Sequence, residues 1–308
     1  MGVQISAIVA TRNRATYLRK ALQSLLDQSL DPESYEIIVV DNGSQDETKK
    51  IVAEISPAPN LRYLYEPAPG VSRARNLGWR AARGTYVSFM DDDAVACRNW
   101  LDLYLEAFES FGWGIGSIGG RVELIWEAPK PDWLLDEKLG ILSVYRYSDR
   151  PVVLKRDQWL SICNLAYPRE VLQAAGGLRE DLGRRGTMLL TSAEYDLKRI
   201  LDGRGLPSIY HPDIVVGHHI SPARLTKTWF RRHAYWHGFS EALMSTAFAS
   251  SPHSRVKVSL EKILWALPRL LVGLATPDPA ARFKREYQVI QSLGFLRGVW
   301  RKGTGHAT

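Results

Sequence analysis

Three consecutive carboxylates, Asp91-Asp92-Asp93, directly follow an apolar run at residues 86–90 that has strand character. Adjacent negative charges repel one another, so a folded protein keeps such a cluster more readily when a cation offsets it. Mg²⁺ and Mn²⁺ prefer oxygen ligands and are commonly held by one or two carboxylates together with substrate phosphates. The alternative is a solvated acidic loop or a helix-capping aspartate. The other strand ends must decide between a divalent metal site and this alternative.

Two earlier strand ends also carry polar side chains. Thr11-Arg12-Asn13-Arg14 follows the apolar run at residues 5–10, and Asp41 follows the run at residues 36–40. Asp41 could accept a hydrogen bond from a base N–H or a ribose hydroxyl, and a helix-capping role is equally open. The chain has no G-x-G-x-x-G after its first strand and no G-x-x-x-x-G-K-[ST], so neither the usual dinucleotide-binding fold nor a P-loop is supported.

A third polar segment begins a helix. Gly70 precedes a helical pattern whose first turn holds Arg73 and Arg75. The helix dipole favours acids at this position, so two cations there indicate an anionic ligand nearby. Two solvated surface arginines are the alternative.

Strands and helices alternate regularly through residues 1–93, and they must position these side chains. The apolar runs cover residues 5–10, 36–40, 61–65 and 86–90, and helix-like segments lie near 15–27, 45–55 and 72–83. This alternation predicts an α/β fold with a mainly parallel sheet and helices on both faces. Ligands bind at the carboxyl ends of the strands in such sheets, which is where the polar residues fall.

The rest of the chain has longer elements. We expect a helix over about 99–110, strands near 117–125, 159–166 and 207–216, a helix at 194–203, and C-terminal helices at 225–250, 254–274 and 279–298. Residues 224–308 hold 14 Lys/Arg and 4 Asp/Glu, whereas residues 1–223 hold 26 and 29, so the net charge of +7 comes from the C-terminal part. This uneven distribution of charge predicts that residues 1–223 carry out the chemistry and that residues 224–308 dock onto another surface.

The cysteines and the N-terminus bear on location. Cys97 and Cys163 form neither a metal-binding spacing nor a disulfide framework, which favours a reducing cytoplasm. The chain enters a strand almost at once, so we expect no signal peptide.

Residues 5–93 resemble the nucleotide-sugar-binding half of a family 2 glycosyltransferase with the GT-A fold. The resemblance is carried by Thr11-Arg12-Asn13, the turn at residues 39–44, residues 70–78 with Ala74-Arg75-Asn76, and residues 84–93. It implies a D-x-D metal motif at Asp91–Asp93 for Mg²⁺ or Mn²⁺. It also implies a nucleotide-sugar site formed by Thr11, Arg12, Asn13, Asp41, Arg75, Asp91 and Asp92. Alternate residues of an extended segment point in opposite directions, which favours Asp91 and Asp93 over Asp92 as metal ligands.

A second acidic segment resembles the family's E-D-x-D-L motif, whose second acid is the catalytic base. Glu194 falls on that position, Ala193 replaces the preceding acid, and Asp196 is expected to orient the site or start the helix. Acids that merely favour the helix N-terminus are the alternative. His218-His219 ends a later strand, and the resemblance implies that one of them, His218 by its better match, lies near the metal. A structural histidine is the alternative.

Tryptophans gather where the family builds its acceptor site. Flat indole rings suit sugar faces, although core packing is their commoner use. The four in question are Trp113, Trp126, Trp133 and Trp159.

The resemblance implies an inverting, metal-dependent transfer of one sugar from a nucleoside-diphosphate sugar, with uridine the favoured nucleotide, to an acceptor hydroxyl. A saccharide or lipid-linked acceptor, in polysaccharide, glycolipid or cell-surface glycan biosynthesis, is expected. The GT-A domain would span residues 1–223, with a donor and metal half at 1–97 and an acceptor half at 98–223, and the basic helical extension would span 224–308. Residues 254–302 could contact the inner face of the cell membrane, and nucleic-acid binding is not expected. A metal-dependent nucleotidyltransferase and a non-catalytic binding protein remain the alternatives.

Overall fold

The computed structural model describes residues 2–55, 58–112, 114–246 and 252–301. The chain divides into two compact units, which we name the sheet unit and the helical unit. The sheet unit consists of residues 1–127, 137–181 and 193–220, and the helical unit of residues 128–136, 182–192 and 221–308. The boundary predicted at residue 223 stays a proposal about folding domains.

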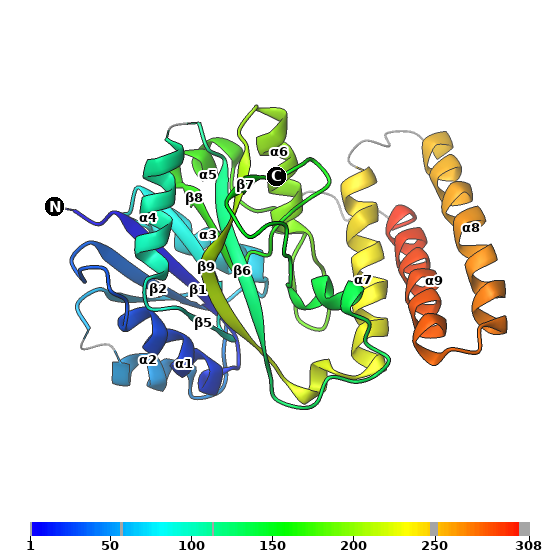
Figure 1. Ribbon diagram of the computed structural model, residues 1–308, viewed down its shortest axis with the longest axis horizontal. Coiled ribbons are helices and arrows are strands. Elements are labelled where there is room, and N and C mark those ends of the chain that lie inside the picture. Colours follow the sequence, from blue (N-terminus) through cyan, green and yellow to red (C-terminus); the bar gives the residue numbers. More distant parts are fainter. Residues whose placement is uncertain (1, 56–57, 113, 247–251, 302–308) are drawn as a thin grey trace. The chain divides into compact units, whose positions relative to one another are not determined.

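The sheet unit is built on a nine-stranded sheet in the order β3-β2-β1-β4-β8-β6-β9-β5, with β7 paired to β9 (Figure 1). The strands are β1 (Ile5–Thr11), β2 (Tyr35–Asp41), β3 (Leu61–Tyr65), β4 (Tyr86–Asp91), β5 (Ala94–Ala96), β6 (Ser117–Trp126), β7 (Val152–Val153), β8 (Asn164–Pro168) and β9 (Ser208–Ile220). Strands β3, β2, β1 and β4 run parallel, so their carboxyl ends meet at one edge. Beyond β4 the sheet becomes mixed, because β8 is antiparallel to both β4 and β6, whereas β6 and β9 are parallel.

Helices cover both faces of this sheet, as the sequence predicted. They are α1 (Ala15–Leu26), α2 (Thr48–Ile55), α3 (Val71–Ala81), α4 (Trp100–Phe111), α5 (Arg169–Ala175) and α6 (Ala193–Gly203). Alternate residues of β1 point to opposite faces: Ile5, Ala7 and Val9 join the core that contains α1 and α4. Ile8 points the other way, and a Cβ at Gly78 of α3 would lie 2.5 Å from its Cγ2 atom. Gly78 therefore lets α3 approach the sheet closely.

A buried amide joins the mixed half of the sheet. The Asn164 Oδ1 atom accepts hydrogen bonds from Trp100 Nε1 and Tyr104 Oη, both at 2.8 Å. Its Nδ2 atom donates to the carbonyl oxygens of Arg121 and Ile214, both at 2.9 Å. These four bonds tie α4, β6 and β9 to the first residue of β8. The sequence predicted that this strand begins near residue 159, but in the structure β8 begins at Asn164.

Glu36 is a fully buried carboxylate at the opposite end of β2 from Asp41. It accepts hydrogen bonds from Ser6 Oγ at 2.8 Å, Arg62 Nη1 at 2.7 Å and the Arg83 backbone N–H at 2.6 Å. Burial raises the pKa of Glu36, but these hydrogen bonds outweigh burial and the pKa lies below its usual value. The ionised carboxylate therefore stabilises the fold.

We expect Glu36→Gln to lower the free energy of unfolding at pH 7 by about 1–3 kcal/mol, because charged hydrogen bonds are lost. The folded-state pKa is lowered, so the stabilisation is present above the unfolded pKa and is lost as the pH falls through the folded pKa. Urea unfolding at a series of pH values should show wild type and variant converging below about pH 4. Glu33→Gln, at an exposed acid just before β2, is the control. A difference that does not change with pH would contradict this assignment.

The helical unit contains α7 (Lys227–Thr246), α8 (Pro252–Ala275) and α9 (Pro279–Val299), and these three helices confirm the predicted C-terminal segments. Helix α9 lies between α7 and α8 (Figure 1). Glycines allow α7 and α9 to touch: a Cβ at Gly238 would lie 1.8 Å from the Gln291 oxygen, and one at Gly294 would lie 1.8 Å from the Tyr235 oxygen. Within the described residues, none of the helices combines the length and the apolar character needed to cross a membrane.

Candidate active site

Hydrogen bonds join the loops after β1 and β2. The Asn13 backbone N–H donates to Ser44 Oγ at 2.9 Å, and Asn13 Oδ1 accepts from the Gln45 N–H at 2.7 Å. Asn13 has a φ of +54°, a left-handed conformation that asparagine tolerates better than most residues. Asn13 therefore positions the loop that carries its predicted partners Thr11 and Arg12.

Asn42 extends this network to the loop before α3. Its Nδ2 atom donates to the carbonyl oxygens of Glu66 at 3.0 Å and Ala68 at 2.7 Å, and its Oδ1 atom accepts from the Gly70 N–H at 2.8 Å. Three loops at the carboxyl edge of the parallel strands thus form one hydrogen-bonded framework.

Asp41 is buried in this framework. Its Oδ1 atom accepts from the Ser44 N–H, and its Oδ2 atom accepts from Tyr63 Oη, both at 2.8 Å. Burial raises the pKa of Tyr63, and the neighbouring Asp41 carboxylate raises it further. The Tyr63 hydroxyl therefore stays protonated and holds Asp41 in place.

Asp91 ends β4 and meets Arg75 from α3. The Arg75 Nη2 atom lies 2.5 Å from Asp91 Oδ1, and the Arg75 side chain is only 10% exposed. The alternative of a solvated surface arginine therefore fails for Arg75. Arg73, by contrast, is 45% exposed and pairs with Glu180.

Asp92 and Asp93 share a different arginine. Arg14 Nη1 lies 3.1 Å from Asp92 Oδ1 and 2.5 Å from Asp93 Oδ2, while Thr11 Oγ1 donates to Asp92 Oδ2 at 2.8 Å. Burial raises the pKa of Asp92 to about 6, although the Arg14 charge opposes the rise. The expected alternation of side chains is wrong here, because residues 92–93 form a turn between β4 and β5 and both carboxylates reach Arg14. Arg14 is therefore the arginine that contacts Asp92 and Asp93, whereas the predicted Arg12 is exposed.

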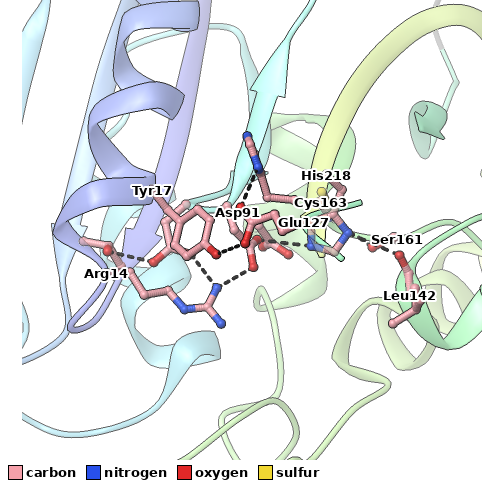
Figure 2. A network of polar contacts seen from close by, with 12 residues as sticks. Arg14, Tyr17, Asp91, Glu127, Leu142, Ser161, Cys163 and His218 are labelled. Carbon is pink, nitrogen blue, oxygen red and sulfur yellow. Dashed lines mark hydrogen bonds and ion pairs between the residues drawn. The ribbon is translucent and has the colours of Figure 1, made fainter. Parts of the chain in front are cut away.

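Strand pairing brings His218 to Asp93. Strand β5 is antiparallel to β9, with Ala94 opposite His218, and His218 Nε2 lies 3.2 Å from Asp93 Oδ1. Figure 2 shows His218 beside Cys163 and Asp91. His218 Nδ1 lies 3.2 Å from the Leu142 carbonyl oxygen, which can only accept a hydrogen bond. A neutral His218 therefore carries its proton on Nδ1 and turns the lone pair of Nε2 toward the carboxylate. Two acceptors this close require a cation or a proton between them.

His219 belongs to a different cluster. Its Nδ1 atom lies 2.9 Å from Glu127 Oε1, and Tyr17 Oη donates to Glu127 Oε2 at 2.6 Å. The hydrogen bond from Tyr17 is the main reason that the pKa of Glu127 lies below its usual value. Of the two histidines, His218 is thus the one that faces Asp93.

Cys163 is a third group beside Asp91 and His218. The register of β8 on β4 pairs Met90 with Asn164, which sets Cys163 next to Asp91. Asp91, Cys163 and His218 each offer a ligand atom within 4.8 Å of the other two. Burial, and then the charges of Asp91 and Asp93, raise the pKa of the Cys163 thiol well above its usual value. Carboxylate oxygen, imidazole nitrogen and sulfur together form a donor set that fits a divalent metal ion.

Glu194 lies in the first turn of α6, among aromatic side chains. Burial raises the pKa of both Tyr145 and Tyr167, and the charge of Glu194 raises both further. The charge of Arg75 also acts on Tyr167, in the opposite direction. Tyr167 therefore lies near both Glu194 and Arg75.

Aromatic side chains contact one another at the Glu194 segment. Trp159 Nε1 donates to Tyr145 Oη at 3.0 Å, and the rings of Trp159 and Tyr195 meet edge to face with centroids 5.2 Å apart.

Trp133 packs against Phe230 in the helical unit, so it has a packing role. Trp126 is 36% exposed, and Trp113 lies outside the described residues. Asp196 pairs with Arg179 at 3.5 Å.

Comparison with known proteins agrees with this geometry. Residues 6–135 match the family model described as glycosyl transferase family 2. This segment belongs to glycosyltransferase family 2. The chain is 23% identical over 251 residues to the glucosyl-dolichyl phosphate glucuronosyltransferase of Haloferax volcanii, covering 80% of this chain and 79% of the relative. It is 35% identical over 124 residues to the glycosyltransferase AglE of the same organism, a match that spans 40% of each protein.

The fold of the chain also has a solved counterpart. The mannosyltransferase PcManGT from Pyrobaculum calidifontis, determined in complex with GDP-Man and Mn²⁺, superposes with a TM-score of 0.65 at 20% identity. The match covers 98% of this chain and 89% of that structure. This match confirms the predicted GT-A type of fold. The family model and the curated relatives confirm the predicted transferase class.

Sequence reasoning missed several residues of the candidate site. Arg14, Tyr63 and Cys163 each contact a predicted residue, yet none of them was singled out. Arg14 lies within a polar segment that was noted, and its position two residues after Arg12 was the only available signal. Nothing in the sequence around Cys163 or Tyr63 distinguishes either from an ordinary core residue.

Proposed function

We propose that the chain transfers one sugar from a nucleoside-diphosphate sugar to an acceptor hydroxyl, with inversion at the anomeric carbon and with Mg²⁺ or Mn²⁺ as cofactor. The observation that carries this proposal is the approach of His218 Nε2 to Asp93 Oδ1, at 3.2 Å, beside Asp91 at the carboxyl end of β4. A histidine nitrogen and a carboxylate this close in a nearly buried site are stabilised by a cation between them or by a proton on the nitrogen, and the proposal takes the cation.

The proposed ligands of Mg²⁺ or Mn²⁺ are Asp91, Asp93 and His218. The Cys163 sulfur, which lies near the Asp91 and His218 ligand atoms, would bind only a softer ion such as Co²⁺ at this site. The bond from His218 Nδ1 to the Leu142 carbonyl would fix the ring so that Nε2 faces Asp93 and could bind the metal, as outer-sphere hydrogen bonds do in known sites. When bound, the cation would supply Lewis-acid stabilisation to the negative charge that develops on the diphosphate leaving group.

The proposed donor site uses the three joined loops. Asp41 would accept from the base or ribose, and Thr11, Arg12 and Asn13 would line the nucleotide. Arg75 would place positive charge near the diphosphate. Asp92, buried and bonded to Thr11 and Arg14, would keep Arg14 aimed at the same place.

Glu194 is the proposed base. It would take the proton of the acceptor hydroxyl as that oxygen bonds to the anomeric carbon and the carbon–oxygen bond to the diphosphate breaks. Attack opposite the leaving group inverts the anomeric centre in one step. Trp159 and Tyr195 offer flat faces against which a sugar could stack.

We propose the class of acceptor and the cellular location in more general terms. The Haloferax relative is named for a dolichyl phosphate-linked sugar, which supports a lipid-linked or saccharide acceptor in polysaccharide, glycolipid or cell-surface glycan biosynthesis. We propose a cytoplasmic enzyme that contacts the inner face of the membrane through residues 254–302. Uridine remains the proposed nucleotide, although PcManGT was determined with a guanosine donor.

Product analysis tests this function against its alternatives. Purified protein with Mn²⁺ and a panel of nucleotide sugars should release a nucleoside diphosphate from one of them. Pyrophosphate released from a nucleoside triphosphate would instead indicate a nucleotidyltransferase. No release from any nucleotide sugar would leave a non-catalytic binding protein.

Cys163 gives a spectroscopic test of the metal site. We expect Co²⁺-loaded protein to show a sulfur-to-cobalt charge-transfer band, because the thiol lies within 4.8 Å of the Asp91 and His218 ligand atoms. Cys163→Ser should lose the band and keep the weaker visible bands of the bound ion. Cys97→Ser, at the other cysteine, is the matched control and should keep both. A spectrum without the band in wild type would exclude Cys163 as a ligand.

A further inference from the structure

Helix α8 exposes a continuous apolar stripe. Of the sixteen large apolar side chains that are exposed among the described residues, nine lie on this helix. Seven of them follow the helical spacing i, i+4, i+7, i+8, i+11, i+14, i+15, and so share one face: Val256, Leu260, Ile263, Leu264, Leu267, Leu270 and Leu271. Their exposed fractions run from 44% to 70%, the highest at Leu264.

The packing of the helical unit leaves this stripe uncovered. Helix α8 packs against α9 through other residues, such as Ser259, whose Oγ accepts from Trp300 Nε1 at 3.1 Å (Figure 1). Soluble proteins rarely expose a continuous face of seven large apolar side chains unless that face binds a protein, a ligand or a membrane.

Helix α8 also carries a net positive charge. Helix α8 carries Arg255, Lys257, Lys262 and Arg269 against one acid, Glu261. The Arg269 guanidinium lies 3.6 Å from the centre of the Trp265 ring, and Trp265 is 38% exposed. By helical spacing Lys257 lies beside the stripe, whereas Lys262, Trp265 and Arg269 lie on the opposite side of the helix. An apolar stripe on a helix of net positive charge suits the interface of an anionic membrane.

We propose that the Val256–Leu271 stripe of α8 inserts into the surface of an anionic lipid bilayer, and that the net positive charge of residues 224–308 attracts this part of the chain to the lipid phosphates. This inference gives the proposed membrane contact of residues 254–302 a defined face and a ligand class, and it does not depend on the transfer chemistry.

The charge pattern favours lipid over a second copy of the chain. A symmetric pairing of two α8 stripes would bring together two helices of the same net positive charge, and like charges repel. An anionic surface attracts this positive charge, so both the apolar stripe and the charge of the helix contribute to binding.

Vesicle sedimentation without any donor sugar tests the proposal. Wild type should sediment with vesicles of equal parts phosphatidylcholine and phosphatidylglycerol and much less with phosphatidylcholine alone. The Leu264→Glu/Leu271→Glu variant should lose at least about tenfold in partition coefficient. Val153→Glu/Leu293→Glu makes the same change at two equally exposed positions outside the stripe and should bind as wild type does. Circular dichroism of each variant verifies that the helices are intact.

Three results would overturn the proposal. The first is no sedimentation of wild type with the anionic vesicles, and the second is equal binding by the stripe variant. The third is reversible dimerisation of wild type, absent in the stripe variant, without vesicle binding, which would assign the stripe to a second copy. Each of these results leaves nucleoside-diphosphate release from a soluble donor unaffected, so the test is separate from that of the proposed transfer.

Discussion

Glu194→Gln is expected to lose about 10²–10⁴-fold in turnover, the range that a positioned general base contributes. The amide keeps the size of the side chain but cannot take the acceptor proton. Glu194 lies at the start of α6 and not in the loops that would hold the nucleotide, so binding of the donor nucleotide should remain close to that of wild type. Turnover with saturating donor and calorimetric binding of the nucleoside diphosphate measure the two effects separately.

A control variant excludes a purely structural effect of the first turn of α6. Asp196 lies in the same turn, so Asp196→Asn removes an equal charge from the helix N-terminus. Loss of the dipole interaction alone costs about 0.3–1 kcal/mol and would affect the two variants alike. We expect Asp196→Asn to retain most of the turnover. Similar losses in both variants, or the larger loss in Asp196→Asn, would contradict the role assigned to Glu194.

Asp93→Asn is expected to weaken Mn²⁺ binding by more than about 100-fold, since even outer-sphere partners of metal ligands are worth about 10–100-fold. Asp93 is 5% exposed in its side chain and meets both Arg14 and His218, so the neutral amide would remove the carboxylate oxygen nearest to His218. The electron paramagnetic resonance signal of free Mn²⁺, titrated with protein, reports binding without any need for activity.

Asp102→Asn is the matched control for the metal experiment. Asp102 is a carboxylate in the first turn of α4 that bonds to Ser29, away from the Asp91–Asp93 segment. It should bind Mn²⁺ as wild type does. If Asp93→Asn bound Mn²⁺ equally well, the acids would be a structural cluster balanced by Arg14 and Arg75.

The first half of the fold was predictable because its signals are local. Each apolar run of five to seven residues forms one parallel strand, and the residue at its carboxyl end is read directly from the sequence. Asp41 and Asp91 therefore fell at one edge of the sheet as soon as the strands were taken to be parallel. Helices α1 and α3 followed from apolar residues at helical spacing.

The contacts that complete the site were not predictable, because they depend on strand registers between distant segments. Cys163 reaches Asp91 only through the antiparallel register of β8 on β4, and His218 reaches Asp93 only through the register of β5 on β9. Strand β5 has three residues, too few for a recognisable pattern. The turn at residues 92–93 likewise has no turn-forming glycine or proline, which is why the alternation of side chains was misjudged.

A thermal-shift panel tests the central claim most directly. Wild type and Asp93→Asn are melted with each nucleoside diphosphate and nucleotide sugar, with and without Mn²⁺. A ligand that binds only the folded protein raises the melting temperature according to its concentration relative to its dissociation constant. We predict that one nucleotide and its sugar stabilise wild type far more with Mn²⁺ than without it, and that Asp93→Asn loses this metal-dependent part. The absence of any metal-dependent shift in wild type, or an equal shift in the variant, would contradict the proposed site.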